Sequence, residues 1–309
     1  MTALLHDLLA YSADRTPEVR ALKFRTTDVS YAVLATLVER FAGALVSAGL
    51  RKQERVGVYL PKRPETVATI FGAPHAGGVF VPINPLLKPP QVGHILRDCN
   101  VRVLVTSAQR ASELADELRQ SPDLRLLVVV DGDASSEATP GLTSVAWDEF
   151  LAGAAGLPFR VIDTDMAAIL YTSGSTGKPK GVVLSHRNMV TGAKSVAQYL
   201  GNTPDDRLLA VLPLSFDYGF SQLSTAFHVG ASVVLMDYLF PRDVLKLVVQ
   251  ERITGLAAVP PVWIQMAELD WPATVTEHLR YFTNSGGAMP TATLAKLRAA
   301  WPKTKPYLM

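Results

Sequence analysis

The stretch RVGVYLPKRPETVATIFGAPHAGGVFVPINP, residues 55–85, contains the repeating unit of the fold. It opens with a short β-branched run at 55–60, continues with a helix that begins at Pro64, and ends with a strand at 79–85. The following residues repeat this order, because PPQVGHILRDCN predicts a helix begun by prolines and VRVLVTS predicts another strand. Strands and helices that alternate at this spacing predict right-handed crossovers and a parallel sheet covered on both faces.

The same alternation extends along the chain in both directions. From Tyr31 to Leu50, apolar residues recur every three or four positions, which predicts a helix that ends near Gly49. Ser185 is a capping residue type and predicts that a helix begins at His186. Further strands are expected at 124–131, 166–173, 181–186, 207–213, 231–237 and 253–260, and further helices at 186–200 and 241–252. The sequence therefore predicts an α/β fold with two mostly parallel sheets layered with helices.

The composition limits the classes of protein that the chain fits. With 309 residues, of which 48% are hydrophobic and 19% charged, the chain can bury a large core as one large domain or two closely packed ones. Its 30 basic and 28 acidic residues are spread along the sequence and give a formal net charge of +2. No block of like charge therefore indicates binding to nucleic acid or to an anionic membrane.

Cysteine and histidine form no pattern typical of a disulfide or a metal site. The one cysteine, Cys99, cannot form an internal disulfide or a multi-thiolate zinc site, which favours a reducing compartment. The six histidines show no metal-ligand spacing, so no metal-binding residue is expected. The N-terminus lacks secretory features, and no apolar stretch approaches the roughly 18 residues of a transmembrane helix. We expect a mature cytoplasmic protein without a transmembrane segment.

A second stretch, LYTSGSTGKPKG at residues 170–181, concentrates the residue types that hold phosphate. Its glycines let backbone amides approach an anion, its hydroxyl side chains add donors, and Lys178 and Lys180 add positive charge. These residues alone leave two interpretations open, the tip of a hairpin and a phosphate-binding loop. A Walker A loop is excluded, because Pro179 stands where that motif needs glycine and a strand follows. A serine hydrolase is disfavoured, since no G-x-S-x-G occurs at the serines of this stretch.

Longer motifs favour the phosphate-binding loop over the plain hairpin tip. YTSGSTGKPKGV (171–182) resembles the phosphate-binding motif of the AMP-forming acyl-CoA ligase and adenylate-forming enzyme superfamily. Residues 55–85 resemble the stretch upstream of that motif, and LLAVLPLSFDYGF (208–220) and TNSGGAMP (283–290) resemble the downstream substrate and nucleotide motifs, in the expected order. Within the superfamily, VYLPKRPETV, NPLLKPPQVGHILRDC and AVLPLSFDYGFSQL resemble the acyl-CoA ligases associated with exosortase A systems. The resemblance covers essentially the whole chain.

The resemblance implies a two-step reaction. A carboxylate attacks the α-phosphate of ATP to give acyl-AMP and pyrophosphate, and a thiol then takes the acyl group. The implied cofactors are ATP, Mg²⁺ and coenzyme A, and the implied substrate is a fatty or other acyl acid. Two alternatives stay open, an enzyme that loads the phosphopantetheine of a carrier protein and a catalytically silent fragment that binds nucleotide or partner chains.

The motif match also implies the nucleotide-binding residues. Those expected at the ATP phosphates are Thr172, Ser173, Gly174, Ser175, Thr176, Gly177 and Lys180. Of these, Thr176 and Lys180 are expected to act in catalysis. Lys178 lies in a position that the family leaves variable, which favours solvent exposure. Gly286, Gly287 and Ala288 are expected between the adenylate and the acyl group.

The resemblance places further residues at the acyl substrate. Tyr218 stands at the family's aromatic position near the carboxylate, and Gly287 and Trp263 are expected on the substrate side. A buried structural tryptophan is the alternative for Trp263. Phe216 and Phe220 either form the wall of the acyl pocket or fill the core. Many acyl-CoA ligases carry histidine where this chain has Phe216, which leaves the nature of the substrate open.

The resemblance ends with TKPYLM at residues 304–309. The family's Tyr-Gly-x-Thr-Glu motif, whose glutamate helps to hold Mg²⁺, belongs after this point. The aspartate at the ribose hydroxyls, the hinge and the C-terminal domain with its adenylation lysine also belong after it. We therefore expect residues 1–309 to form an incomplete AMP-binding N-terminal domain, with the C-terminal domain absent.

Overall fold

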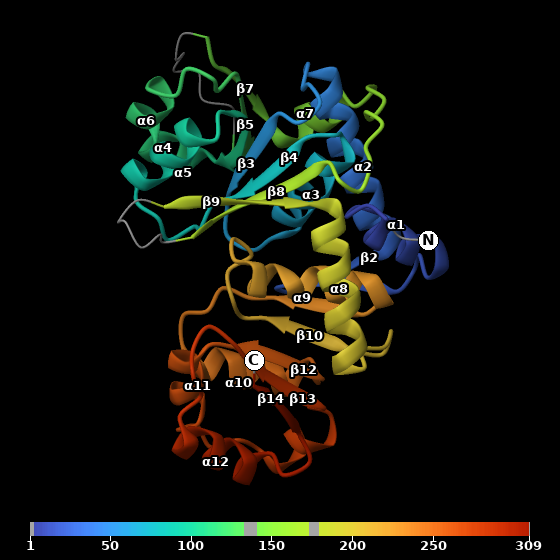
Figure 1. Cartoon of the computed structure of the whole chain (residues 1–309), viewed down its shortest axis with the longest axis vertical. Helices are drawn as coiled ribbons and strands as arrows, with labels where there is room; N and C mark the ends of the chain where they lie inside the picture. The colour runs from blue at the N-terminus through green and yellow to red at the C-terminus, as the bar shows by residue number, and fades with distance from the viewer. Residues whose placement is uncertain (1–2, 133–140, 173–178, 309) are drawn as a thin grey trace. The chain divides into compact units, whose positions relative to one another are not determined.

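The computed structural model describes residues 3–132, 141–172 and 179–308. The chain divides into two compact units (Figure 1). The first unit contains Met1–Tyr11 and Ala32–Thr191, and the second contains Ser12–Tyr31 and Gly192–Met309. Each unit is built around one seven-stranded sheet of the described residues.

The sheet of the first unit has the strand order β7-β6-β5-β3-β4-β8-β9. Its strands are β3 (Arg55–Tyr59), β4 (Val79–Pro82), β5 (Val101–Ser107), β6 (Leu126–Val130), β7 (Thr143–Ala146), β8 (Met166–Thr172) and β9 (Lys180–Ser185). Neighbouring strands are parallel except for β8 and β9, which form an antiparallel pair at one edge.

Helices cover both faces of this sheet. They are α2 (Tyr31–Ser47), α3 (Pro64–His75), α4 (Pro89–Asp98), α5 (Ala108–Glu113), α6 (Ala115–Arg119) and α7 (Trp147–Ala152). Figure 1 shows α4, α5 and α6 grouped on one side and α2, α3 and α7 on the other. Two more helices, α1 (Asp7–Arg15) and α8 (His186–Leu200), run across the boundaries of the two units along the chain.

The sheet of the second unit has the strand order β14-β13-β12-β10-β11-β1-β2. Its strands are β1 (Arg20–Phe24), β2 (Thr27–Ser30), β10 (Arg207–Ala210), β11 (Ser232–Leu235), β12 (Gly255–Ala258), β13 (Tyr281–Asn284) and β14 (Lys305–Leu308). Its helices are α9 (Asp217–Val229), α10 (Pro241–Gln250), α11 (Pro260–Met266) and α12 (Thr291–Ala300), with a 3₁₀ helix at Ala273–Glu277. Only β1 and β2 pair in antiparallel fashion among these strands.

The α/β fold class that the sequence predicts is confirmed. The opening stretch and the residues after it form β3-α3-β4-α4-β5, and β3 lies between β4 and β5 in the sheet. Helix α3 begins at Pro64 and α4 at Pro89, as the proline signals predict. Gly49, just after α2, has a φ of 82°, and the Oγ of Ser185 accepts the backbone N–H of Asn188 at the start of α8.

The strand predictions are less complete. The predicted strand at 207–213 ends at Ala210, and the predicted strand at 253–260 ends at Ala258, because Pro260 starts α11. The sequence patterns did not predict β1, β2, β7, β13 and β14. The last of these, KPYL, leaves both end residues exposed and carries little of the apolar signal of a central strand.

Three histidines cluster in the first unit. The His6 ring centroid lies 4.4 Å from that of His75 and 5.9 Å from that of His186. The Nδ1 atom of His186 accepts the backbone N–H of Leu5 at 3.0 Å, so its ring proton lies on Nε2. Three other ring nitrogens, Nδ1 of His6, Nδ1 of His75 and Nε2 of His186, are buried without a hydrogen-bond partner among the described residues.

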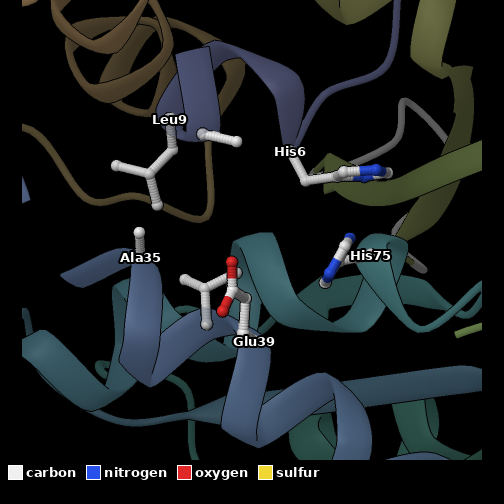
Figure 2. A pocket seen from close by; sticks show the side chains of 7 residues that line it. His6, Leu9, Ala35, Glu39 and His75 are labelled. Carbon is white, nitrogen blue, oxygen red and sulfur yellow. The ribbon is translucent and has the colours of Figure 1, made fainter. Parts of the chain in front are cut away.

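A small cavity adjoins this cluster. Its volume is about 30 Å³, and Figure 2 shows His6 and His75 beside it with Glu39 from α2. Burial is the main reason why the pKa of His6 falls to about 3 and that of His186 to about 4. Burial also lowers the pKa of His75. The carboxylates of Asp7, Glu39, Asp163 and Asp165 oppose these shifts but do not cancel them.

We expect the folded chain to lose stability as the pH falls below 6.5. The unfolded chain protonates these histidines near pH 6.5, whereas the folded chain keeps His6 and His186 neutral down to about pH 4. The unfolded state therefore binds more protons in this window, and each of the two histidines contributes about 2 kcal/mol of stability at pH 7.5 that is lost by pH 5. Urea unfolding at several pH values measures this. A His6→Gln variant should show a flatter pH dependence, and equal slopes for the two proteins would contradict the explanation.

Candidate functional site

The predicted phosphate-binding stretch connects β8 and β9. The two strands pair so that Tyr171 lies opposite Gly181 and Thr172 lies opposite Lys180. Both Thr172 and Lys180 are exposed at the end of this antiparallel pair. The predicted residues Ser173, Gly174, Ser175, Thr176 and Gly177, together with Lys178, lie outside the described residues. The prediction of two strands that flank this stretch is confirmed, and the phosphate contacts of its residues stay predictions.

Gly181 has a steric role in this pair of strands. A Cβ atom at Gly181 would lie 2.7 Å from Cγ2 of Ile169 and 3.3 Å from Cζ of Tyr171. The Tyr171 ring therefore lies against β9 only because the opposite residue has no side chain. Burial is the largest cause that raises the pKa of Tyr171, and its hydrogen bond to Asp98 raises it further, so the phenol stays protonated and donates.

A second group of predicted residues gathers at the carboxyl end of β13 in the second unit. Tyr218 stands in the first turn of α9, and its hydroxyl oxygen lies 2.5 Å from Oγ1 of Thr283 in β13. Burial raises the pKa of Tyr218, so its hydroxyl remains neutral. The carboxyl ends of parallel strands are where α/β folds bind ligands.

The predicted glycines lie at the same strand end. The side-chain amide of Asn284, the last residue of β13, donates to the carbonyl oxygen of Gly287 at 2.9 Å. Gly286 has a φ of 78°, a left-handed backbone conformation that glycine adopts without strain. Gly286, Gly287 and Ala288 are all exposed. The structure thus brings Tyr218 and Gly287 to one strand end, as a shared substrate site requires.

Two buried oxygen atoms of the second unit have no hydrogen-bond partner among the described residues. They are Oγ of Ser215, which follows β10, and Oδ1 of Asn284. A buried polar atom without a partner costs about 1–3 kcal/mol unless a ligand or water contacts it. Both atoms are therefore candidates for contact with a polar substrate.

Gly219 fixes the position of Tyr218 and was not among the predicted site residues. A Cβ atom at Gly219 would lie only 2.0 Å from the carbonyl oxygen of Pro213. The first turn of α9 therefore packs directly on the backbone that leaves β10. The only sequence signal was the glycine itself within SFDYGF. Thr283 was missed in the same way, because its contact with Tyr218 joins residues that are 65 positions apart.

Trp263 lies in the core of the second unit. Its side chain is fully buried, and its indole N–H donates to the carbonyl oxygen of Ala258 at 2.9 Å. The rings of Phe282 and Trp301 lie 5.1 Å and 6.3 Å from it, centroid to centroid. These contacts explain Trp263 as a packing residue, and its acyl-pocket role stays a prediction. Phe220 is buried as well, whereas Phe216 is 41% exposed.

The described residues contain neither a cluster of metal ligands nor a membrane-spanning helix. In residues 3–132, 141–172 and 179–308, no three histidine, cysteine or acidic side chains lie where they could hold a metal ion. Among the helices of these same ranges, none combines the length and the apolar character that crossing a bilayer requires.

Comparison with known proteins gives consistent matches over nearly the whole chain. The L-proline:L-prolyl-carrier protein ligase of Streptomyces coelicolor is 33% identical over 289 residues, which are 90% of this chain and 53% of that protein. The long-chain-fatty-acid CoA ligase FadD13 of Mycobacterium tuberculosis is 32% identical over 301 residues, with 95% and 57% covered. The chain therefore spans about half the length of these relatives.

A solved structure extends the comparison to three dimensions. The inhibitor-bound N-terminal domain of FACL13 from Mycobacterium tuberculosis superposes with a TM-score of 0.79 at 28% identity. The match covers 96% of this chain and 73% of that one. The sequence also matches the AMP-binding enzyme family over residues 9–308. The chain belongs to the AMP-binding enzyme family.

Proposed function

We propose that the whole protein is an AMP-forming ligase that activates a carboxylic acid with ATP and transfers the acyl group to coenzyme A. The observation that carries this proposal is the β8–β9 pair, in which exposed Thr172 and Lys180 lie opposite each other in a member of the AMP-binding family. A hydroxyl donor and an ammonium group side by side suit the phosphate chain of ATP.

The proposed chemistry has two steps. A carboxylate oxygen bonds to the α-phosphorus of ATP while the bond from that phosphorus to the bridging oxygen breaks, and pyrophosphate leaves. A thiolate then attacks the acyl carbon, and AMP leaves with the electron pair of the broken bond. Lys180 would offset the negative charge that develops on the departing pyrophosphate, and Thr172 would donate a hydrogen bond to it, without rearranging. Mg²⁺, when bound with ATP, would supply additional positive charge at the same phosphates.

The substrate side of the proposal uses the residues around β13. Tyr218 would face the carboxylate of the acid, and Gly286, Gly287 and Ala288 would lie between the adenylate and the acyl group. The unpartnered Oδ1 of Asn284 supports a polar ligand at this strand end. We further propose that residues 1–309 are an incomplete N-terminal AMP-binding domain, that the protein acts in the cytoplasm, and that it belongs with the exosortase A-associated acyl-CoA ligases.

A second candidate is a ligase that loads an amino acid onto a carrier protein. The specific observation in its favour is Asp217, whose exposed carboxylate stands next to Tyr218 in the first turn of α9. Its Oδ1 atom accepts the Tyr218 backbone N–H at 2.7 Å, which fixes the carboxylate at the start of the helix. An amino acid would pair its ammonium group with this carboxylate, whereas a fatty acid has no group for it.

An acid screen on the full-length gene product separates the two candidates. Each acid is incubated with ATP and Mg²⁺ in the presence of coenzyme A, a carrier protein, or both, and the thioester products are measured. The primary proposal predicts acyl-CoA from an acid without an amino group, and retained activity in an Asp217→Asn variant. Amino-acyl carrier protein as the only product, with activity lost in Asp217→Asn, would establish the second candidate and contradict the first.

A further inference from the structure

Helix α4 contacts both strands that flank the phosphate-binding stretch. The Tyr171 hydroxyl, on β8, donates to Oδ2 of Asp98 at 2.6 Å. Nε2 of His94 lies 3.3 Å from the carbonyl oxygen of Pro179, the residue directly before β9. His94 and Asp98 are four positions apart in the helix and therefore lie on one face.

The chemical groups in the two contacts determine which partner donates each hydrogen bond and which accepts it. A carbonyl oxygen only accepts, so the proton of the His94 imidazole must lie on Nε2 for this contact. Asp98 accepts from a phenol that burial and this same hydrogen bond keep protonated. The helix thus offers a donor to one strand and an acceptor to the other.

Other contacts hold α4 in place. Val92, Ile95 and Leu96 are buried in the core of the first unit. The Arg97 guanidinium donates to the Glu117 carboxylate of α6 at 2.8 Å. At the start of the helix, the Lys88 backbone N–H donates to the Gln91 side chain at 3.0 Å. Because its apolar face is packed, α4 can serve as a rigid support.

The contacts of α4 with Pro179 and Tyr171 lie next to Lys180 in the strand pair, and Lys180 is the residue that the proposed chemistry needs. Pro179 directly precedes Lys180, and its ring restricts its own φ. The Pro179 carbonyl belongs to the peptide group that joins these two residues, so holding it orients the backbone from which the Lys180 side chain leaves. Tyr171 lies opposite Gly181 in the pairing of β8 with β9, so its contact with Asp98 restrains the same end of the strand pair.

We propose that His94 and Asp98 are positioning residues for the phosphate-binding strands. They act through Pro179 and Tyr171, and they hold Lys180 in the orientation that the ATP phosphates require. The proposal rests on the proposed function, since it assigns the ATP phosphates to this end of β8 and β9. It predicts that removing the contacts of His94 or Asp98 weakens the binding of ATP and leaves the binding of the carboxylic acid unchanged.

The test is made with paired variants in the full-length protein. His94→Ala and Asp98→Ala remove the contacts, and each should raise the KM for ATP by about fivefold to tenfold, the fold-change of one lost hydrogen bond. The KM for the acid should stay within about twofold. His94→Gln still offers an N–H to Pro179, and Asp98→Asn still offers an oxygen to Tyr171, so both should recover most of the loss.

Arg97→Ala is the matched control on the same helix. It removes the contact with α6 and none with the phosphate-binding strands. The buried side chains of Val92, Ile95 and Leu96 still hold the helix, so the KM for ATP should stay within about twofold. Equilibrium binding of ATP by calorimetry is measured beside carboxylate-dependent exchange of pyrophosphate into ATP. Unchanged KM and Kd for ATP in both alanine variants would overturn the positioning role alone.

ATP binding and pyrophosphate exchange together distinguish a failure of the positioning role from a failure of the proposed function. Absent exchange together with ATP binding that the alanine variants weaken would overturn the proposed function and support the positioning role. Absence of both exchange and ATP binding in the unaltered protein would overturn both. A KM increase that the Gln and Asn variants fail to recover would also count against positioning by hydrogen bonds.

Discussion

Replacing Lys180 by alanine is expected to lower the rate of carboxylate-dependent pyrophosphate exchange by about 100-fold or more. Lys180 begins β9, is exposed, and lies opposite Thr172, so its ammonium group can meet the phosphate chain. Removing one preorganised charged or hydrogen-bonding group from a transition state that develops negative charge costs about this much. The measurement is the exchange rate at saturating ATP and acid.

Lys178→Ala is the matched control for this prediction. The two lysines stand two positions apart in the same motif, and the resemblance leaves the position of Lys178 variable. Its loss should change the exchange rate by less than about threefold, as expected for a charge that does not touch the transition state. If the exchange rate fell equally in the two variants, only the overall positive charge of the motif would matter. An unchanged exchange rate in Lys180→Ala would show that Lys180 takes no part in the chemistry.

Replacing Asp206 by alanine is expected to lower the free energy of unfolding by about 3 kcal/mol. Asp206 is 2% exposed, and its carboxylate accepts hydrogen bonds from Arg280 at 2.6 and 2.9 Å and from Thr254 at 2.6 Å. Burial alone would raise its pKa, but hydrogen bonds from Arg280 and Thr254 hold it below the ordinary value. The three residues precede β10, β12 and β13 in turn, so one carboxylate joins three adjacent strands.

The neighbouring residue provides the control. Asp205 is exposed, and Asp205→Ala should change the free energy of unfolding by no more than about 0.5 kcal/mol. Urea unfolding at pH 7.5 compares the two variants with the unaltered chain. Similar stabilities for Asp205→Ala and Asp206→Ala would show that the Asp206 network contributes little to the sheet.

The elements that the sequence predicts well are those whose signal is local. Residues 55–107 carry β-branched strands and proline-initiated helices, and both kinds of signal act within a few residues. Strand β1 is short and carries no such signal; it pairs with β2 a few residues later and with β11, more than 200 residues later in the chain. The pairing with β11 depends on tertiary contacts that no window of sequence contains.

The residues of the candidate site also differ in whether a local sequence signal identifies them. Motif resemblance was enough to single out Lys180, Tyr218 and Gly287, because these residue types sit at fixed places within short motifs. Thr283 and His94 were not predicted, although each contacts a predicted residue or its neighbour. Their contacts join residues 65 and 85 positions apart, so they depend on how the strands and helices pack.

Exchange of radiolabelled pyrophosphate into ATP by the full-length protein, with and without a panel of carboxylic acids, tests the proposed adenylation most directly. We expect exchange that requires an acid and Mg²⁺ and that falls by about 100-fold in Lys180→Ala. A protein that is folded and binds ATP, yet shows no acid-dependent exchange above the Lys180→Ala variant with any acid tested, would contradict the assignment as an adenylate-forming ligase.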